Sequence, residues 1–278
     1  MNHNPDTLSP VLYLPHGGGP LPLLGEPGHA ALTAFLKDIP VALGEPAAIL
    51  VVSAHWEEER PAITAAARPE LVYDYYGFPP ESYAIRYPAP GDPDLAEAVR
   101  ALLDAGGFVP RLDDRRGFDH GLFVPLKLMY PAARIPCLQV SLLASLDPAE
   151  HIALGKALAP LRARNVLVIG SGMSFHNMRM LIAPDADSGG KDVAFDDWLG
   201  ETCIGPTLSA DARERRLVEW DRAPGARFCH PREEHLLPLH VCYGVACADT
   251  PVAEAVFSQH VLGQQVSGFL WRQSGRHD

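Results

Sequence analysis

The chain has 278 residues, of which 47% are hydrophobic and 21% charged, as is ordinary for a soluble globular enzyme with ample length for a buried core. Its 34 acidic and 23 basic side chains give a formal net charge of −11, which argues against nucleic acid and anionic membrane surfaces as partners. No run reaches the roughly 20 apolar residues that span a bilayer.

The first residues, MNHNPDTLSP, are polar and have neither the basic nor the apolar segment of a signal peptide. The 5 cysteines are odd in number and include no CxxC pair. We therefore expect a cytoplasmic protein with reduced thiols. Cys229 lies near a histidine-rich stretch, and we interpret it as a small buried hydrophobic residue.

Strand and helix patterns alternate along the chain. Apolar runs typical of strands buried on both faces occur at 11–15, 47–54, 135–142 and 165–170. Helices are predicted at 28–38, 93–105, 122–130, 148–163, 209–222 and from 233 onward, polar loop residues at 183–192, and a closing strand or hairpin at 260–272. We predict a single α/β domain over 1–278, with a central, mostly parallel (mixed) sheet, helices on both faces and a small edge hairpin region.

Three of these strands lead into a histidine. The run 11–19 ends in His16 and three glycines, the run 47–54 delivers His55, and the run from 165 passes through Gly-Ser-Gly to His176. In open α/β sheets the ligand crevice lies outside the carboxyl ends of the strands. Imidazole is a common metal ligand and a general base near neutral pH, so three such residues predict a metal or acid–base site.

Other histidines divide between the site and the rest of the fold. His120 immediately precedes an apolar helical run, and His235 lies in the first turn of the helix predicted from residue 233. Both can face a cleft. We expect His29 and His151 on the surface, while His240 is five positions after His235 and points elsewhere on its helix.

Residues 70–90 crowd tyrosines, phenylalanine and prolines together. Such a segment suits either a small edge hairpin or the wall of a pocket for a flat ligand. We favour the pocket wall, because the segment follows His55 and Trp56 closely in the chain.

Six blocks now stand in order: LPHGGGP, VVSAHW, YDYYGFPPESYAIRYP, GFDHGLFVPL, VLVIGSGMSFHN and REEHLLPL. Together they resemble the class III extradiol ring-cleavage dioxygenases, and most closely the 4,5-DOPA extradiol dioxygenase branch with its LigB-type catalytic domain. The resemblance covers nearly the whole chain. It implies an enzyme that opens the ring of a DOPA-like or related catechol with O₂ and forms a muconate-semialdehyde-type product.

The resemblance implies a metal site as well. His16 and His55 match two metal-binding histidines, and His235 matches the third ligand. That third ligand is a glutamate in protocatechuate-type members, and Glu234 leaves a carboxylate ligand open here. One divalent metal is implied, Fe(II) for activity, although three histidines also suit Zn²⁺.

Two more roles follow from the resemblance. His176 matches the acid–base catalyst and, in some metal-bound members, lies near or on the metal. His120 matches a histidine that orients substrate or oxygen atoms derived from O₂. The implied partners are a small aromatic diol and O₂, with the protein acting as a monomer or homodimer.

Three alternatives use the same residues differently. A zinc-dependent hydrolase would activate water at the histidines. A serine hydrolase would use Ser171 or Ser174, although GSGMS is not the GxSxG nucleophile motif. A non-enzymatic metal-binding protein on the same fold is the third.

Overall fold

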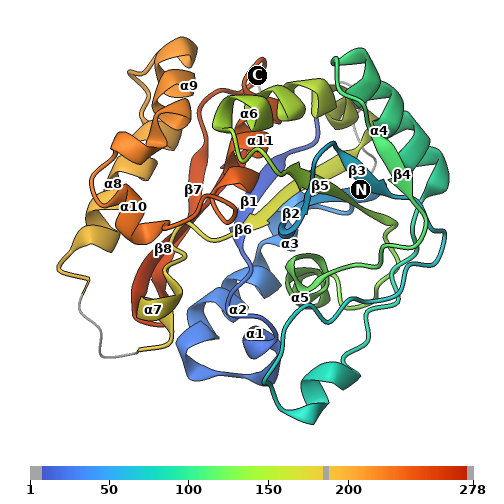
Figure 1. The fold of residues 1–278 in the computed structure, drawn as a ribbon, viewed down its shortest axis with the longest axis horizontal. Helices are drawn as coiled ribbons and strands as arrows, with labels where there is room; N and C mark the ends of the chain where they lie inside the picture. Colours follow the sequence, from blue (N-terminus) through green and yellow to red (C-terminus); the bar gives the residue numbers. More distant parts are fainter. Residues whose placement is uncertain (1–7, 184–187, 274–278) are drawn as a thin grey trace.

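Eight strands form one mixed sheet in the order β4-β3-β5-β2-β6-β1-β8-β7 (Figure 1). The structure, a computed structural model, describes residues 8–183 and 188–273. The four central strands run parallel and are β5 (Cys137–Leu143), β2 (Ala48–Glu58), β6 (Val166–Gly172) and β1 (Val11–Pro15). All residues of β1, β5 and β6 are buried, as the unbroken apolar runs predict for strands covered on both faces.

Shorter or antiparallel strands complete both edges of the sheet. They are β3 (Ala62–Thr64) and β4 (Arg111–Asp113) on one side, and β8 (Gln264–Trp271) and β7 (Glu254–Val261) on the other. Of the two predicted forms of the C-terminal segment, a closing strand or a hairpin, the structure has the hairpin, but it begins at Glu254 rather than at residue 260.

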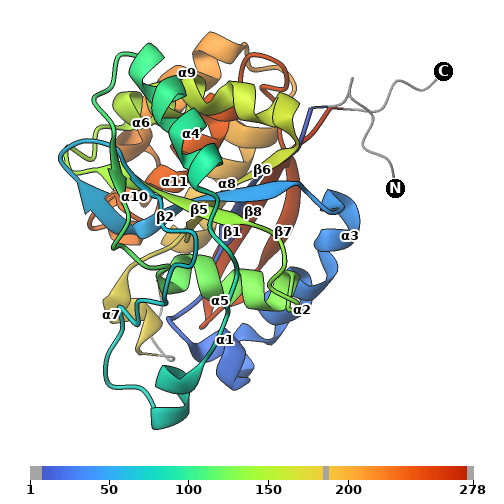
Figure 2. The ribbon, with the colours of Figure 1, turned by 90° about the vertical axis from the view of Figure 1, so that its right-hand side faces the viewer.

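Helices cover both faces of the sheet, and Figure 2 shows the two layers edge-on. One face carries α4 (Pro93–Ala105), α6 (Pro148–Leu158), α8 (Lys191–Ile204), α9 (Ala210–Val218), α10 (Ala226–Cys229) and α11 (Leu237–Ala246). The other carries α2 (Ala30–Asp38), α3 (Pro40–Leu43) and α5 (His120–Met129), with α1 (Leu21–Leu24) and α7 (Met178–Leu181) near the carboxyl ends of the central strands. Short 3₁₀ turns occur at η1 (Pro27–His29), η2 (Pro80–Ala84), η3 (Ala159–Arg164) and η4 (Trp220–Arg222).

This arrangement confirms the predicted single-domain α/β fold. Two predicted helix starts are also confirmed in atomic detail, because Asp92 accepts a hydrogen bond from the backbone N of Leu95 and Asp147 accepts one from that of Ala149. Among the described residues, no helix is both long and apolar enough to cross a membrane.

Some predicted boundaries were wrong. Strand β2 does not stop at residue 54 but continues to Glu58. Its pairing with β6 ends at Ser53, and its pairing with β5 is interrupted between Val52 and Glu57. His55 therefore lies inside the strand, in a stretch released from regular pairing. The last helix begins at Leu237 rather than at residue 233, so His235 occupies the turn before it.

Two segments also differ from their predicted form. Residues 70–90 form no hairpin: the chain runs extended, with an isolated bridge from Leu71 to Phe118, and then enters η2. The stretch 209–222, whose dense charges predict a solvated helix, contains α9 and η4, but Arg213, Leu217 and Trp220 are buried there.

His29 and His151, expected on the surface, are fully buried. The Nε2 atom of His151 accepts a hydrogen bond from the backbone N of Leu143 (3.1 Å), and its Nδ1 donates to the carbonyl oxygen of Asp147 (2.7 Å). His29 similarly accepts from the backbone N of Gly18 (2.9 Å). Both are core residues because each ring nitrogen has a partner, which an apolar pattern does not reveal.

The buried structural histidines should make the metal-free protein acid-sensitive. Burial lowers the pKa of His151 from 6.5 to about 4, that of His240 to about 4 and that of His230 to about 3. Below pH 6.5 the unfolded chain therefore binds more protons than the folded one. The free energy of unfolding should fall as the pH drops toward 4, by about 1.4 kcal/mol per pH unit for each histidine.

Denaturant titrations over this pH range test the prediction. In His151→Gln, the amide can replace both hydrogen bonds without titrating, so the pH slope should decrease by the share of one histidine. An unchanged slope would rule out protonation of His151 as a cause.

Candidate metal centre

Five histidines from separate segments meet at the carboxyl ends of the central strands. His16 follows β1, His55 lies in the irregular part of β2, His176 follows β6, His120 begins α5 and His235 precedes α11. The ring centroids are 3.9 Å apart for His55 and His120, 4.9 Å for His16 and His55, 5.3 Å for His16 and His235, and 3.2 Å for His176 and His235. The structure thus brings all five predicted site histidines together.

Glycines allow this convergence. A Cβ atom on Gly172 would collide with the carbonyl oxygen of His235, so only glycine lets that residue approach β6. The same carbonyl accepts hydrogen bonds from the backbone N of Met173 (3.0 Å) and the hydroxyl of Tyr13 (3.1 Å). Gly17, after His16, adopts a left-handed conformation with φ +82°. The backbone of His235 is consequently held in place independently of its side-chain contacts.

The protonated nitrogen of His16 is set by its neighbours. The hydroxyl of Ser171 donates to the carbonyl oxygen of Gly121 (2.5 Å), so it accepts from His16 Nδ1 (3.0 Å). The Nε2 atom of His16 therefore offers a lone pair, and it lies 3.1 Å from Nε2 of His55. Burial, followed by the neighbouring His55, lowers the pKa of His16 well below its usual value.

Asp74 lies behind two of the imidazoles. Its Oδ1 accepts hydrogen bonds from Nδ1 (2.8 Å) and the backbone N (3.1 Å) of His120, and its Oδ2 is 3.6 Å from Nδ1 of His55. Burial alone would raise the pKa of Asp74, but the hydrogen bonds from His120 and the electrostatic attraction of His120 and His55 together outweigh it and lower that pKa. The ionised carboxylate favours Nδ1–H in both rings and leaves their Nε2 atoms for the site.

Glu234 takes the same position behind the other pair. Its Oε1 is 2.9 Å from Nδ1 of His235 and 3.3 Å from Nδ1 of His176. Its Oε2 receives Arg232, which also forms a bidentate pair with Glu57 at 2.5 and 2.6 Å. Burial would raise the pKa of Glu234, but the hydrogen bond from His176 contributes to lowering it.

This donor set fits a divalent metal. Two groups of described residues have ligand atoms within 4.8 Å of one another, His16-His55-His120 and His176-Glu234-His235. The facing Nε2 atoms of His16 and His55 have a spacing of 3.1 Å, which suits two ligands each about 2.1 Å from one ion. The Nε2 atom of His235 is buried and has no hydrogen-bond partner in the described structure. Burial lowers the pKa of His55 and of His235 well below the usual value, so the neutral, metal-binding form is favoured.

The histidines open into a cavity of about 550 Å³. Tyr75, Tyr76 and Phe78 from the aromatic segment form part of its wall, which confirms the pocket-wall interpretation of that segment. The rings of Tyr75 and His120 meet edge to face, with centroids 5.8 Å apart. A flat aromatic ligand can therefore lie beside the imidazoles.

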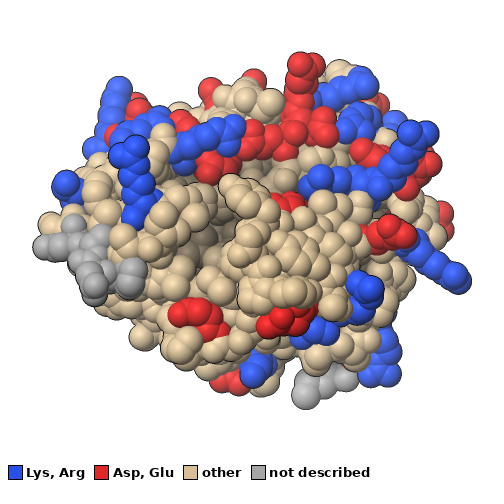
Figure 3. Space-filling view, turned by 60° about the horizontal axis from the view of Figure 1, so that its bottom comes forward, with Lys and Arg blue, Asp and Glu red and all other residues tan. Residues whose placement is uncertain are grey.

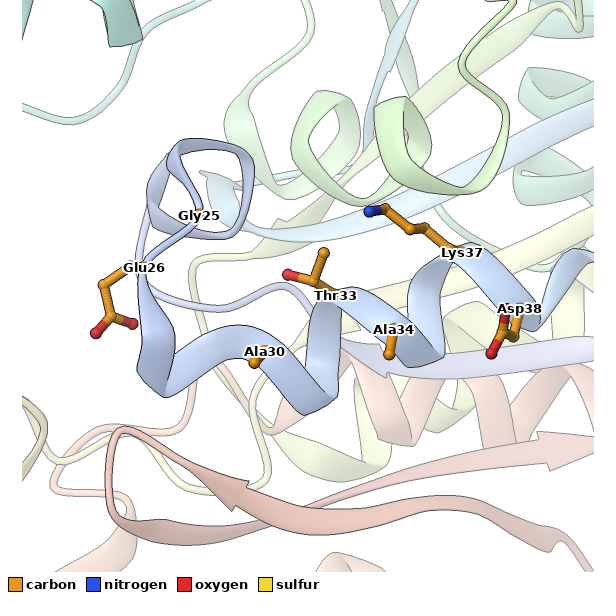
Figure 4. A pocket seen from close by; sticks show the side chains of 7 residues that line it. All are labelled: Gly25, Glu26, Ala30, Thr33, Ala34, Lys37 and Asp38. Carbon is orange, nitrogen blue, oxygen red and sulfur yellow. The ribbon is translucent and has the colours of Figure 1, made fainter.

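A second depression, of about 430 Å³, runs along α2 and is shown in Figure 4. Its lining residues are Gly25, Glu26, Ala30, Thr33, Ala34, Lys37 and Asp38. Because this set contains no histidine or cysteine, we assign it no chemistry.

The nucleophile candidates are occupied elsewhere. Ser171 gives its proton to a backbone carbonyl, and Ser174 is buried and accepts from the backbone N of Ser267 (2.8 Å). Cys229 is a buried hydrophobic residue, as expected, and burial raises its pKa to about 12. Neither serine has the geometry of an activated nucleophile.

Residues 13–269 match the family described as "Catalytic LigB subunit of aromatic ring-opening dioxygenase". The chain belongs to this family. It is 42% identical to "4,5-DOPA dioxygenase extradiol" of Beta vulgaris, over 87% of this chain and 88% of that one. It is 39% identical to "Dioxygenase tasH" of Hapsidospora irregularis, over 95% of this chain and 86% of that one. A crystal structure of "uncharacterized protein JW3007" from Escherichia coli K12 superimposes with a TM-score of 0.75 at 28% identity, covering 94% and 99% of the two chains.

The LigB-family chain is therefore an extradiol-type dioxygenase, as the sequence blocks indicated, and this class uses a divalent metal. The comparisons do not favour the hydrolase and binding-protein alternatives. Sequence reasoning missed Asp74 as a partner of the histidines, although it stands inside one of the six blocks. It also considered Glu234 only as a ligand and Ser171 only as a nucleophile.

Proposed function

We propose that the protein cleaves the ring of a catechol beside its diol, using one divalent metal held by the Nε2 atoms of His16, His55 and His235. The observation that supports this ligand set is the convergence of three neutral imidazoles: two Nε2 atoms face each other, and the third is buried and has no hydrogen-bond partner in the described structure. Fe(II) is the proposed working metal. Bound there, it lets electron density pass from a catecholate to O₂, which otherwise reacts slowly with closed-shell molecules.

The remaining histidines handle protons and orientation. Because Glu234 holds Nδ1 of His176, the Nε2 atom is left to take a phenolic proton and return it as the ring opens. Asp74 holds Nδ1 of His120 in the same manner, so the Nε2 atom of His120 can accept a hydrogen bond from a hydroxyl group of the substrate and orient it. The proposed product is a muconate-semialdehyde-type acid.

Oxygen uptake by metal-stripped protein reloaded with Fe(II) or with Zn²⁺ tests this function. The substrates are a panel of catechols: DOPA, caffeate, protocatechuate and gallate, together with unsubstituted catechol, which carries no carboxylate. We expect uptake only with Fe(II), together with a new visible absorption from the semialdehyde. A folded, Fe(II)-loaded protein that consumes no O₂ with any catechol would contradict the proposal, and ester hydrolysis by the Zn²⁺ form would then favour the hydrolase alternative.

A further inference from the structure

The cavity beside the histidines is larger than a bare diol ring requires. Its volume of about 550 Å³ falls within the range of about 300–1,000 Å³ found for pockets that enclose drug-sized ligands. The histidines occupy one end of the lining, and the rest comes from other side chains. What those side chains are decides which substituent a catechol can carry.

Most of the remaining wall is apolar. It is formed by Leu21, Tyr75, Tyr76, Phe78, Met173, Met178, Leu181, Ile182 and Leu262, together with the glycines after His16. Apart from histidines, the one charged residue among the described lining is Glu26, and its carboxylate is already bonded to Nδ1 of His29 at 2.6 Å. No lysine or arginine belongs to the described lining. A substrate carboxylate placed there would lose water without gaining a cationic partner, which is costly.

The mouth of the cavity is apolar as well. Tyr76 is 92% exposed, Ile182 73% and Met178 52%, and all three border this cavity. Exposed hydrophobic residues that gather around one opening mark a binding surface more often than chance exposure. Figure 3 views the molecule from this side and shows a hollow bordered mainly by uncharged surface.

Two arginines lie nearby but outside this cavity. Arg179 and Arg232 line a neighbouring depression of about 530 Å³ on the other side of His176. Arg232 is held by Glu57 and Glu234, whereas Arg179 is exposed. Arg179 is thus the described cation best placed to capture a substrate carboxylate, and it has to be part of any test.

We propose that the preferred substrate is a catechol with an uncharged, apolar substituent, which lies against Met178, Ile182 and Leu262. A catechol with a free carboxylate or an amino-acid side chain fits this wall less well. The proposal rests on the proposed ring-cleaving function and specifies its substrate class.

A matched pair of substrates tests this directly: 3,4-dihydroxyphenylpropionic acid and its methyl ester. The two share a skeleton and differ in one negative charge. With Fe(II)-loaded protein we expect kcat/KM for the ester to exceed that for the acid by about tenfold or more, mainly through a lower KM. Equal values, or a preference for the acid, would overturn the proposal while leaving ring cleavage intact.

Variants locate the effect. Ile182→Arg places a cation at the mouth and should raise kcat/KM for the acid, reducing or reversing the ester preference. Val109→Arg is the matched control, because Val109 is 65% exposed and does not line the cavity. If Arg179→Gln instead lowers kcat/KM for the acid selectively, the carboxylate binds in the neighbouring depression and the proposal is wrong.

A binding measurement tests the substrate preference independently of ring cleavage. Tryptophan fluorescence can follow binding of the same pair to Zn²⁺-loaded protein without O₂. Tighter binding of the ester supports the apolar-substituent proposal even in a protein that consumes no O₂, and tighter binding of the acid overturns it. Loss of oxygen uptake with every catechol contradicts the proposed function alone.

Discussion

Replacing His55 by alanine is expected to remove the bound metal and the ring-cleaving activity together. The Nε2 atom of His55 lies 3.1 Å from that of His16, and its ring contacts that of His120 at a tilt and that of His235 edge to face. Changes to residues that merely support a ligand cost about 10–100-fold in metal affinity or activity, so loss of a ligand should cost more than about a hundredfold. Metal content after gel filtration and Fe(II)-dependent oxygen uptake measure the two effects on one sample.

His260→Ala is the control for this variant. His260 is exposed on β7, so the same chemical change should leave metal content and activity at the level of the unmodified protein. A His55→Ala protein that stays fully active without bound metal would contradict the assignment of a catalytic metal to this site. A His55→Ala protein that keeps its metal but loses activity would show that His55 is not a metal ligand and acts instead in proton transfer.

The sheet could be predicted because its central strands are buried on both faces. Such strands need continuous apolar runs, and the runs that include Val11, Val51 and Val168 are visible without any alignment. The positions of three site histidines follow from the same runs, since parallel strands end at one edge of the sheet. The predicted end of β2 was wrong because polar residues after Ser53 looked like a loop, whereas an irregular strand tolerates them.

Helix α8 was not predicted because it buries acids. Asp192 accepts a hydrogen bond from the backbone N of Gln265, and Asp196 accepts one from the hydroxyl of Ser267, so both face the adjacent strand β8. An analysis based on apolar periodicity predicts that such acidic residues are exposed to solvent. Buried polar groups whose partners are distant in sequence leave no local signal, and His29 and His151 were misplaced for a related reason.

The sequence predicted the histidines of the site but not the carboxylates that hold them in place. Histidines stand out at strand ends, but Asp74 is 46 residues from His120, and only the fold brings them together. Glu234 illustrates the opposite problem. It is adjacent to His235 in sequence, yet its contact with Nδ1 of His176 depends on the stacking of two rings from separate segments.

Substituting Asp74 by asparagine is expected to lower activity about 10–100-fold while the fold is retained. Asparagine keeps an oxygen that can accept from His120, but it removes the negative charge behind His120 and His55. The substitution also points an NH₂ group toward Nδ1 of His55. This donor favours the tautomer in which the proton of His55 is on Nε2, which cannot then bind a metal. We expect the loss in kcat rather than KM, with a parallel decrease in metal affinity measured by competition with a chromophoric chelator.

Asp113→Asn provides a matched control. The two aspartates have similar side-chain exposure, 17% for Asp74 and 20% for Asp113, but Asp113 pairs with Arg111 in β4 and not with a histidine. If Asp74 served only the fold, both variants would lose thermal stability alike and neither would change metal affinity. An Asp74→Asn protein with unaltered kcat and metal affinity would contradict the assigned role.

Glu234→Gln should behave like Asp74→Asn, and the reason lies in charge. Three neutral imidazoles leave the two positive charges of a divalent metal uncompensated, unlike a site with a carboxylate ligand. Asp74 and Glu234 place one negative charge each behind a proposed ligand, His55 and His235, and one proton-handling histidine. The two carboxylates can therefore compensate the positive charge of the metal without binding it directly. Removing either charge should weaken Fe(II) binding by a similar factor, about 10–100-fold. Normal Fe(II) affinity in the Glu234→Gln protein would contradict this shared role of the two carboxylates in compensating the metal charge.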